Sequence, residues 1–386
     1  MLRAFGRFLE RHLSRSTSSG AFIPEVDGIR FVAILGVLCF HTAGGLFDQR
    51  GVRDWAQHRG IAVGLMGGGW FGVQLFFVLS GFIVALPFAR HWLEGTAAPD
   101  LKRYLLRRLK RIEPPYMLAL TAYYLVAGTP RAWLSDYLAG LTYTHQYFFA
   151  DKNPIAPMTW SLEVEVVFYL LAPWLTGIYR IRGNYRRWLL QAVLIAAPAL
   201  ASCFFLGPVE PSPFQNTLAV TIQYFLAGML LADFYACGFL RRSGLAAWDG
   251  VAAIAACLLT YIVCRIPLTW HYDWLTPALI MLVFAGVLRG RYTNLLFRLK
   301  PITITGGMCY TLYLSHKAVQ DFVAPRLGPL VSGLPDPAAA VAYCAMVVPL
   351  MIAAGVPLYL LIEKPFMTGR LKPLRGPFPY KAAEGT

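Results

Sequence analysis

The sequence contains few charged residues for its length. Only 14% of its 386 residues are Asp, Glu, Lys or Arg, whereas soluble globular domains carry about 25%. A soluble chain of this size needs more polar surface than that to cover itself. The scarcity of charge argues against an ordinary soluble enzyme. The 57% of hydrophobic residues and the mean hydropathy of +0.52 indicate a protein embedded in a membrane.

Several short motifs are also missing. The sequence has no H-E-x-x-H, no P-loop and no G-x-S-x-G, so metalloprotease, P-loop ATPase and α/β-hydrolase assignments have no support. Its seven cysteines form no C-x-x-C pair and fall mostly inside apolar runs. That pattern predicts small buried side chains, with no disulfide framework and no metal site. Residues 1–28 lack the apolar stretch of a cleavable signal peptide.

Long apolar runs are abundant. A run of about 20 apolar residues spans a bilayer as a helix. Such runs lie near 29–47, 70–88, 112–128, 158–178, 188–206, 215–236, 249–266, 272–288, 305–323 and 340–362. A weaker, aromatic-rich run at 133–149 carries Asp136 and His145. The sequence therefore predicts an all-α, polytopic membrane bundle of about ten transmembrane helices.

Charge decides how the weaker run is treated. If 133–149 does not cross and the N-terminus is cytoplasmic, 27 of the 35 Lys and Arg fall in cytoplasmic parts and 7 fall outside. Such a bias is how membrane proteins set their orientation. We therefore expect 133–149 to be a re-entrant or interfacial segment and both termini to lie in the cytoplasm, with the protein in the inner (plasma) membrane. The same distribution explains the net charge of +15 without a nucleic-acid partner.

The chain divides into three expected parts. Residues 1–24 repeat arginine every fourth position beside a leucine and phenylalanine stripe, which predicts a basic amphipathic segment on the cytoplasmic leaflet; a solvated tail is the alternative. Residues 25–366 form the transmembrane domain. Residues 367–386 form a basic cytoplasmic tail.

The first span carries unusual polar residues. Arg30 and His41 are eleven residues apart, so they share one helix face and lie about 16 Å apart along its axis. Ionisable groups inside a membrane are costly and mark functional sites. An imidazole is an inexpensive buried general base. The alternative for His41 is a core histidine that is hydrogen-bonded to a neighbouring helix.

Two arginines, Arg108 and Arg111, lie three residues apart in R-Y-L-L-R-R-L-K-R-I-E-P-P-Y and share a helix face. Guanidinium groups suit phosphates, so a nucleotide-bearing donor such as coenzyme A fits here. The alternative is an ordinary positive-inside loop, which does not explain why the arginines run so close to the span.

Other polar positions are less decisive. Glu163 and Glu165 lie at the start of a span, with Ser161 on the same face as Glu165 and Trp160 suited to an interface. A carboxylate here could orient His41 or bind a sugar hydroxyl. The alternative is that both glutamates lie at an exposed helix start, where acidic residues favour the helix dipole. Ser80, in F-F-V-L-S-G-F, permits close helix packing. His316 lies near a span end, and its role is left open between catalytic, structural and interfacial.

Together these stretches resemble the acyltransferase-3 family of membrane proteins. The shared positions, in order, are Asp27, Gly28, Arg30 and His41; Phe76, Phe77, Ser80 and Gly81; Arg108, Arg111, Ile112 and Pro114; Trp160, Ser161, Leu162 and Glu165; Tyr310, Tyr313 and His316; and Glu363, Lys364 and Pro365. Cys309 stands where a serine is common in the family. The match runs from about residue 25 to residue 366.

The resemblance implies an O-acyltransferase that acts on carbohydrates or glycolipids, such as O-antigens and exopolysaccharides. It implies acetyl-CoA or another acyl-CoA as co-substrate, with no permanently bound cofactor. It makes His41 the candidate catalytic residue, with Arg30 and Glu165 beside it and Arg108 and Arg111 as donor-binding residues. The expected partners are thus an acyl-CoA donor, a glycan or glycolipid acceptor and membrane lipids.

Two other classes of protein stay open at this point. A transporter or flippase for a glycolipid or polysaccharide intermediate also needs polar residues at membrane depth, although no internal repeat of the kind common in transporters is visible. A structural subunit of an envelope synthase predicts no loss of function when His41 is replaced.

Overall fold

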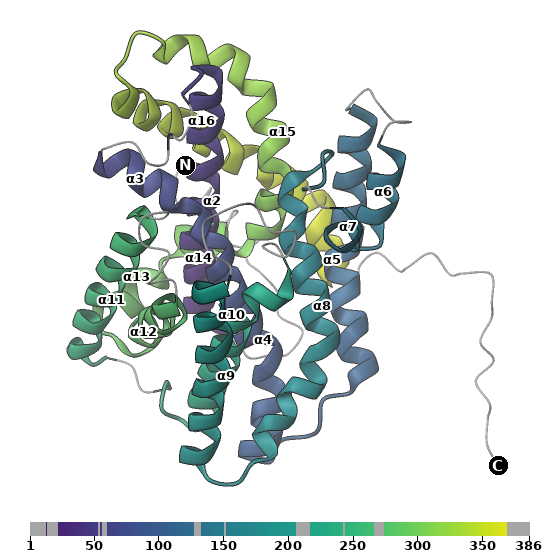
Figure 1. Ribbon diagram of the computed structural model, residues 1–386, viewed down its shortest axis with the longest axis vertical. Coiled ribbons are helices and arrows are strands. Elements are labelled where there is room, and N and C mark those ends of the chain that lie inside the picture. The colour runs from purple at the N-terminus through teal and green to yellow at the C-terminus, as the bar shows by residue number, and fades with distance from the viewer. Residues whose placement is uncertain are drawn as a thin grey trace, which may run out of the picture.

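The computed structural model describes residues 13, 22–52, 55, 60–126, 133–149, 152–205, 217–241, 244–265 and 274–368. Within these ranges every regular element is helical, which confirms the predicted all-α class (Figure 1). The predicted amphipathic segment 1–24 and the tail 367–386 lie almost entirely outside the described residues.

Ten longer helices and several short ones make up the described chain. The longer helices are α2 (Pro24–Gln49), α4 (Gly72–Glu94), α5 (Leu101–Val126), α8 (Trp160–Leu175), α9 (Asn184–Phe205), α10 (Leu218–Ala236), α11 (Ala246–Arg265), α12 (Thr276–Arg289), α15 (Cys309–Leu327) and α16 (Asp336–Leu358). The shorter helices are α3 (Ile61–Gly67), α6 (Leu134–Leu141), α7 (His145–Phe148), α13 (Tyr292–Phe297), α14 (Lys300–Gly307) and α17 (Lys364–Thr368).

Six helical stretches among the described residues are long and apolar enough to cross a bilayer. They are Pro24–Gln49, Ile61–Glu94, Pro157–Arg180, Leu218–Ala236, Ala246–Cys264 and Asp336–Met367. The described residues of the other four predicted runs are also mostly helical, in α5, α9, α12 and α14–α15, but these helices fall outside this set. The chain is a multi-pass membrane protein, and the predicted count of about ten spans is not confirmed.

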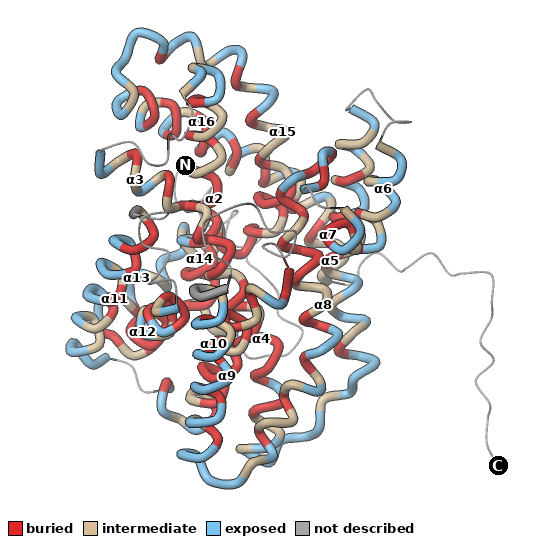
Figure 2. Tube along the Cα trace, viewed as in Figure 1, coloured by how far each residue is buried: buried red, intermediate tan, exposed pale blue. Residues whose placement is uncertain are grey.

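The centre of the bundle is formed by α4 and α10, which pack closely along each other. Small residues allow this approach: a Cβ added at Gly81 of α4 would overlap the backbone of Phe225, and one at Gly228 of α10 would overlap that of Val78. Phe77 and Phe168 both stack on the Phe225 ring, at centroid distances of 4.7 and 4.2 Å. Figure 2 shows the buried residues gathered along these inner helices and the exposed ones on the periphery.

Helix α2 is enclosed by the C-terminal third of the chain. It packs against α14, α15 and α16. The Gln320 side chain of α15 donates a 2.8 Å hydrogen bond to the backbone oxygen of His41, and Asn294 donates one of 2.8 Å to the Glu25 carboxylate. These contacts fix the depth and rotation of α2, and so place Arg30 and His41.

The segment 133–149 forms two short helices, α6 of 8 residues and α7 of 4 residues, beside the upper part of α5 in Figure 1. A rise of about 1.5 Å per residue makes both too short to cross a hydrocarbon core of about 30 Å. Tyr116 of α5 donates to the Gly140 oxygen over 2.8 Å. The Glu163 carboxylate accepts the Gln146 backbone N–H over 2.9 Å. These hydrogen bonds fasten the segment to α5 and α8.

Candidate functional site

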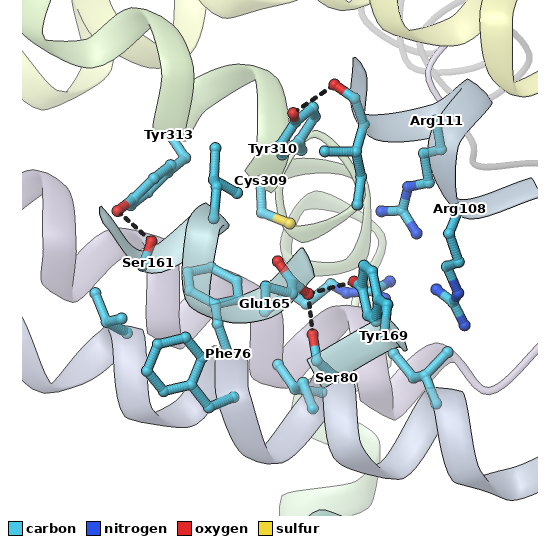
Figure 3. A pocket seen from close by; sticks show the side chains of 17 residues that line it. Phe76, Ser80, Arg108, Arg111, Ser161, Glu165, Tyr169, Cys309, Tyr310 and Tyr313 are labelled. Carbon is cyan, nitrogen blue, oxygen red and sulfur yellow. Dashed lines mark hydrogen bonds between the residues drawn. The ribbon is translucent and has the colours of Figure 1, made fainter. Parts of the chain in front are cut away.

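A pocket opens between α2, α4, α5, α8 and α15 (Figure 3). Residues from segments far apart in the sequence line it: Arg30, Val73, Phe76, Phe77, Leu79, Ser80, Ile83, Arg108, Arg111, Ile112, Ser161, Leu162, Glu165, Tyr169, Cys309, Tyr310 and Tyr313. Seven of them are candidate site residues predicted from the sequence: Arg30, Ser80, Arg108, Arg111, Ser161, Glu165 and Tyr313. The structure therefore brings together residues that the sequence could only place on separate helices.

Glu165 is held in the wall of this pocket by two hydroxyl groups. Ser80 of α4 and Tyr169 of α8 both donate to its Oε1 atom. Figure 3 shows these two bonds converging on one carboxylate oxygen. Tyr169 lies four residues after Glu165, so the helix itself brings them to one face. Ser80, predicted mainly as a packing residue, thus also orients a carboxylate.

Three guanidinium groups line the pocket near that carboxylate. Arg30 is buried and paired with Asp27 on its own helix. Arg108 lies over the Tyr169 ring, 5.3 Å from its centroid. In Figure 3 the Arg108 and Arg111 side chains extend from one helix toward the same space. Neither makes an ion pair within 4.0 Å among the described residues; the charges of Glu363 and Glu165 act on Arg111 from farther away, and both guanidinium groups keep donors that an anion can use.

Ser161 and Tyr313 join two walls of the pocket. Tyr313 of α15 donates to the Met158 backbone oxygen over 2.6 Å. Its hydroxyl also lies 2.8 Å from Ser161 Oγ. Nearby, the Tyr310 hydroxyl donates to the Ile112 backbone oxygen over 2.7 Å. Helices α5, α8 and α15 are therefore tied together around the pocket by buried hydroxyls.

His41 is not among the residues that line this pocket. Its ring lies beside that of His316, with the centroids 4.8 Å apart, and the His316 ring is 5.9 Å from that of Tyr313. The histidine pair therefore lies next to the Tyr313 side of the pocket. The sequence predicts that Arg30 shares a helix face with His41 and that Arg108 shares one with Arg111. It did not predict that His316 is a direct neighbour of His41.

The remaining candidates are more distant from the pocket. Trp160 packs edge-on against Phe77, with centroids 6.0 Å apart. Glu163 is buried and holds α7 instead of facing the pocket. Asp27 acts through Arg30. Tyr169 and Cys309, which line the pocket, were not predicted as site residues; the spacing of Tyr169 from Glu165 was the only available signal.

Comparison with known proteins agrees with this picture. A family model described as an acyltransferase domain, that of acyltransferase-3, matches residues 23–356. The chain therefore belongs to the acyltransferase-3 family, which confirms the resemblance drawn from the motifs and places it in a class of enzymes that transfer acyl groups.

Two relatives illustrate the match. The peptidoglycan O-acetyltransferase OatA of Listeria monocytogenes is 23% identical over 340 residues, covering 80% of this chain and 51% of the relative. The O-acetyltransferase OatA of Staphylococcus aureus is 22% identical over 332 residues, covering 79% and 52%. The chain thus spans about half the length of these curated relatives. No solved structure matches it.

Proposed function

We propose that this protein transfers an acyl group, an acetyl group in the first instance, from acyl-CoA to a hydroxyl of a cell-envelope glycan or glycolipid. The observation that carries the proposal is the pocket lined by Arg30, Arg108, Arg111 and the anchored carboxylate of Glu165, next to the His41–His316 pair. The names of the relatives favour an O-acetylated glycan as the acceptor class.

The donor fits the arginine side of the pocket. Coenzyme A carries several phosphate groups, and arginine forks bind phosphate oxygens with charge-assisted hydrogen bonds. Arg108 and Arg111 face the same space without a carboxylate partner in the described chain. With the phosphates held there, the pantetheine arm extends along the apolar wall of Phe76 and Ile83 toward Tyr313.

The reaction follows from general base catalysis. A nitrogen of His41 takes the proton of the acceptor hydroxyl, whose oxygen attacks the thioester carbonyl carbon. The carbon–sulfur bond then breaks, and the leaving thiolate receives that proton from the imidazolium. The products are the O-acyl ester and free coenzyme A. Glu165, oriented by Ser80 and Tyr169, provides a negative charge in the same pocket that acts electrostatically on Arg111.

For orientation, we place both termini in the cytoplasm of the inner membrane and the segment 133–149 on the opposite side. The supporting observation is the distribution of Lys and Arg along the sequence. Single cysteines introduced by Arg182→Cys and Lys152→Cys test it with a membrane-impermeant maleimide in intact cells. Above the background of the native cysteines, position 152 should label and position 182 should not; the reverse result would invert the topology.

The central experiment measures thiol release from acetyl-CoA by the purified protein in lipid nanodiscs, with and without a glycan acceptor. An acyltransferase releases one thiol per ester formed, which mass spectrometry of the acceptor detects. A transporter or flippase releases none. Absence of both thiol and ester across a panel of envelope glycans and acyl-CoA donors would count against the proposal.

A further inference from the structure

His316 is buried in α15 with one of its two ring nitrogens already committed. The exposed fraction of His316 is 1%. Nδ1 lies 2.7 Å from the backbone oxygen of Tyr313. A carbonyl oxygen only accepts hydrogen bonds, so Nδ1 carries the hydrogen in the neutral ring. Nε2 is then an acceptor with an open lone pair.

That open nitrogen has no hydrogen-bond partner among the described residues. A buried acceptor without a donor is unfavourable, and such an atom in a native fold calls for an explanation. The neighbouring group that can donate to it is the ring of His41, whose centroid is 4.8 Å from that of His316, at an interplanar angle of 40°. Two imidazoles joined by an N–H···N bond have centroids on the order of 5 Å apart, so a small ring rotation completes the bond.

The backbone around the pair limits how His41 moves. Gln320, one turn after His316 on α15, donates to the His41 backbone oxygen over 2.8 Å. A Cβ at Gly45 would overlap the amide of Gln320, so α2 and α15 approach closely at this depth. The two helices therefore hold both histidines at a fixed separation, and side-chain rotation is the remaining freedom.

We infer that His316 is a positioning residue for His41. Its Nε2 accepts the N–H of one His41 nitrogen, which fixes the tautomer of His41 and leaves the other nitrogen as the base for the acceptor hydroxyl. No atom of His316 touches the substrate, and no proton leaves it during the cycle. This inference rests on the proposed function, because it assigns a partner to the proposed base.

Two substitutions at one position separate this role from a purely structural one. In His316→Asn the amide nitrogen takes the place of Nδ1 and keeps the Tyr313 bond, but nothing replaces Nε2. In His316→Gln the amide reaches the place of Nε2 and supplies an acceptor oxygen there. If the acceptor at Nε2 matters, glutamine preserves more activity than asparagine; if the Tyr313 bond matters, the order reverses.

The measurement is kcat and KM for acetyl-CoA in nanodiscs with a fixed acceptor. We expect His316→Asn to lower kcat by about 100-fold with KM changed by less than about twofold, and His316→Gln to stay within about tenfold of wild type. The matched control is Lys317→Arg, which changes the partly exposed neighbour on the same helix but keeps its positive charge, and it should not change kcat. Wild-type kcat in His316→Asn, or asparagine outperforming glutamine, would overturn the inference.

A second measurement observes His316 directly and leaves that residue unchanged. In wild-type protein labelled with ¹⁵N-histidine, nitrogen NMR should show His316 as a neutral ring with its hydrogen on Nδ1 and a hydrogen-bonded Nε2. His41→Gln should shift the Nε2 resonance. An unchanged resonance would remove the proposed bond. If instead His41→Gln retains acyl transfer, His41 is not the base and the positioning role of His316 fails with it, whereas the acyltransferase function is contradicted only when wild-type protein releases no thiol and forms no ester.

Discussion

The carboxylates of Asp233 and Glu165 both lie inside the bundle, but their surroundings differ. Asp233, on α10, is fully buried and accepts bonds from Arg187 Nε at 2.5 Å, Trp188 Nε1 at 2.9 Å and Gln191 Nε2 at 2.8 Å. All of these donors come from the first turns of α9. We call this cluster closed, because the Asp233 carboxylate is paired with the Arg187 guanidinium and both of its oxygens accept hydrogen bonds.

The cluster around Glu165 is open by comparison. The carboxylate receives two hydroxyl groups, and Arg108 and Arg111 face the pocket without a carboxylate partner in the described chain. Both clusters bury charge at a cost that pairing must offset. In the closed cluster the paired charges of Arg187 and Asp233 join α9 to α10. In the open cluster Arg108 and Arg111 make no ion pair within 4.0 Å among the described residues, although the charges of Glu363 and Glu165 act on Arg111, so both guanidinium groups have donors left for an anion. The predictions below test this distinction.

The largest effect is expected at His41, next to the open cluster. His41→Gln and His41→Ala should lower kcat for acyl transfer by about 10²–10⁴-fold, because a positioned general base contributes that much. Expression, membrane insertion and coenzyme A binding should be normal, since the phosphates are held elsewhere. Steady-state kinetics and a binding isotherm for acetyl-CoA give both quantities. Near wild-type turnover in His41→Gln would make the histidine structural.

Substitutions in the closed cluster should lower the stability of the protein and not its catalytic rate. Asp233→Ala leaves the Arg187 charge buried without a partner and should destabilise the protein by about 3–5 kcal/mol. Thermal unfolding in detergent measures this loss. The double replacement Arg187→Met with Asp233→Leu removes both charges and should cost much less than the single change. Equal losses in the two variants would contradict the view that pairing is what makes Asp233 necessary.

Much of the open cluster could be predicted from the sequence. Arg30, Arg108 and Glu165 appeared as ionisable residues at or next to the ends of apolar runs, and the order of motifs linked them. The neighbourhood of His41 and His316 could not be predicted, because it depends on how α2 packs against α15, 275 positions away in the chain. Asp233 was overlooked in an apolar run, since its partner Arg187 lies 46 residues earlier and looked like loop charge.

Donor binding should show an intermediate effect. Replacing either Arg108 or Arg111 by Ala should raise KM for acetyl-CoA by about 10–100-fold, because each hydrogen bond to a charged group contributes about 1.5–3 kcal/mol. Lysine at the same positions keeps the charge but loses the planar fork, so it should restore only part of the affinity. Exposed Arg107 on the same helix provides the control, since Arg107→Ala removes one charge away from the pocket. Equal effects at Arg107 and Arg108 would reduce the site to general surface charge.

The smallest effect is expected at Ser80, which touches the open cluster only through Glu165. Ser80→Ala removes one of the two hydroxyls on that carboxylate and leaves the Tyr169 bond in place. The remaining bond holds Glu165 less firmly, so kcat/KM should fall by about tenfold, equivalent to roughly 1.4 kcal/mol. Ser202→Ala is the matched control, because the Ser202 hydroxyl bonds only within its own helix, to the Pro198 oxygen. A double-mutant cycle with Tyr169→Phe separates shared from independent effects: if both hydroxyls orient the same carboxylate, their combined loss should exceed the sum of the single losses. Strict additivity would mean that Ser80 serves packing alone, as the S-G step on α4 would suggest by itself.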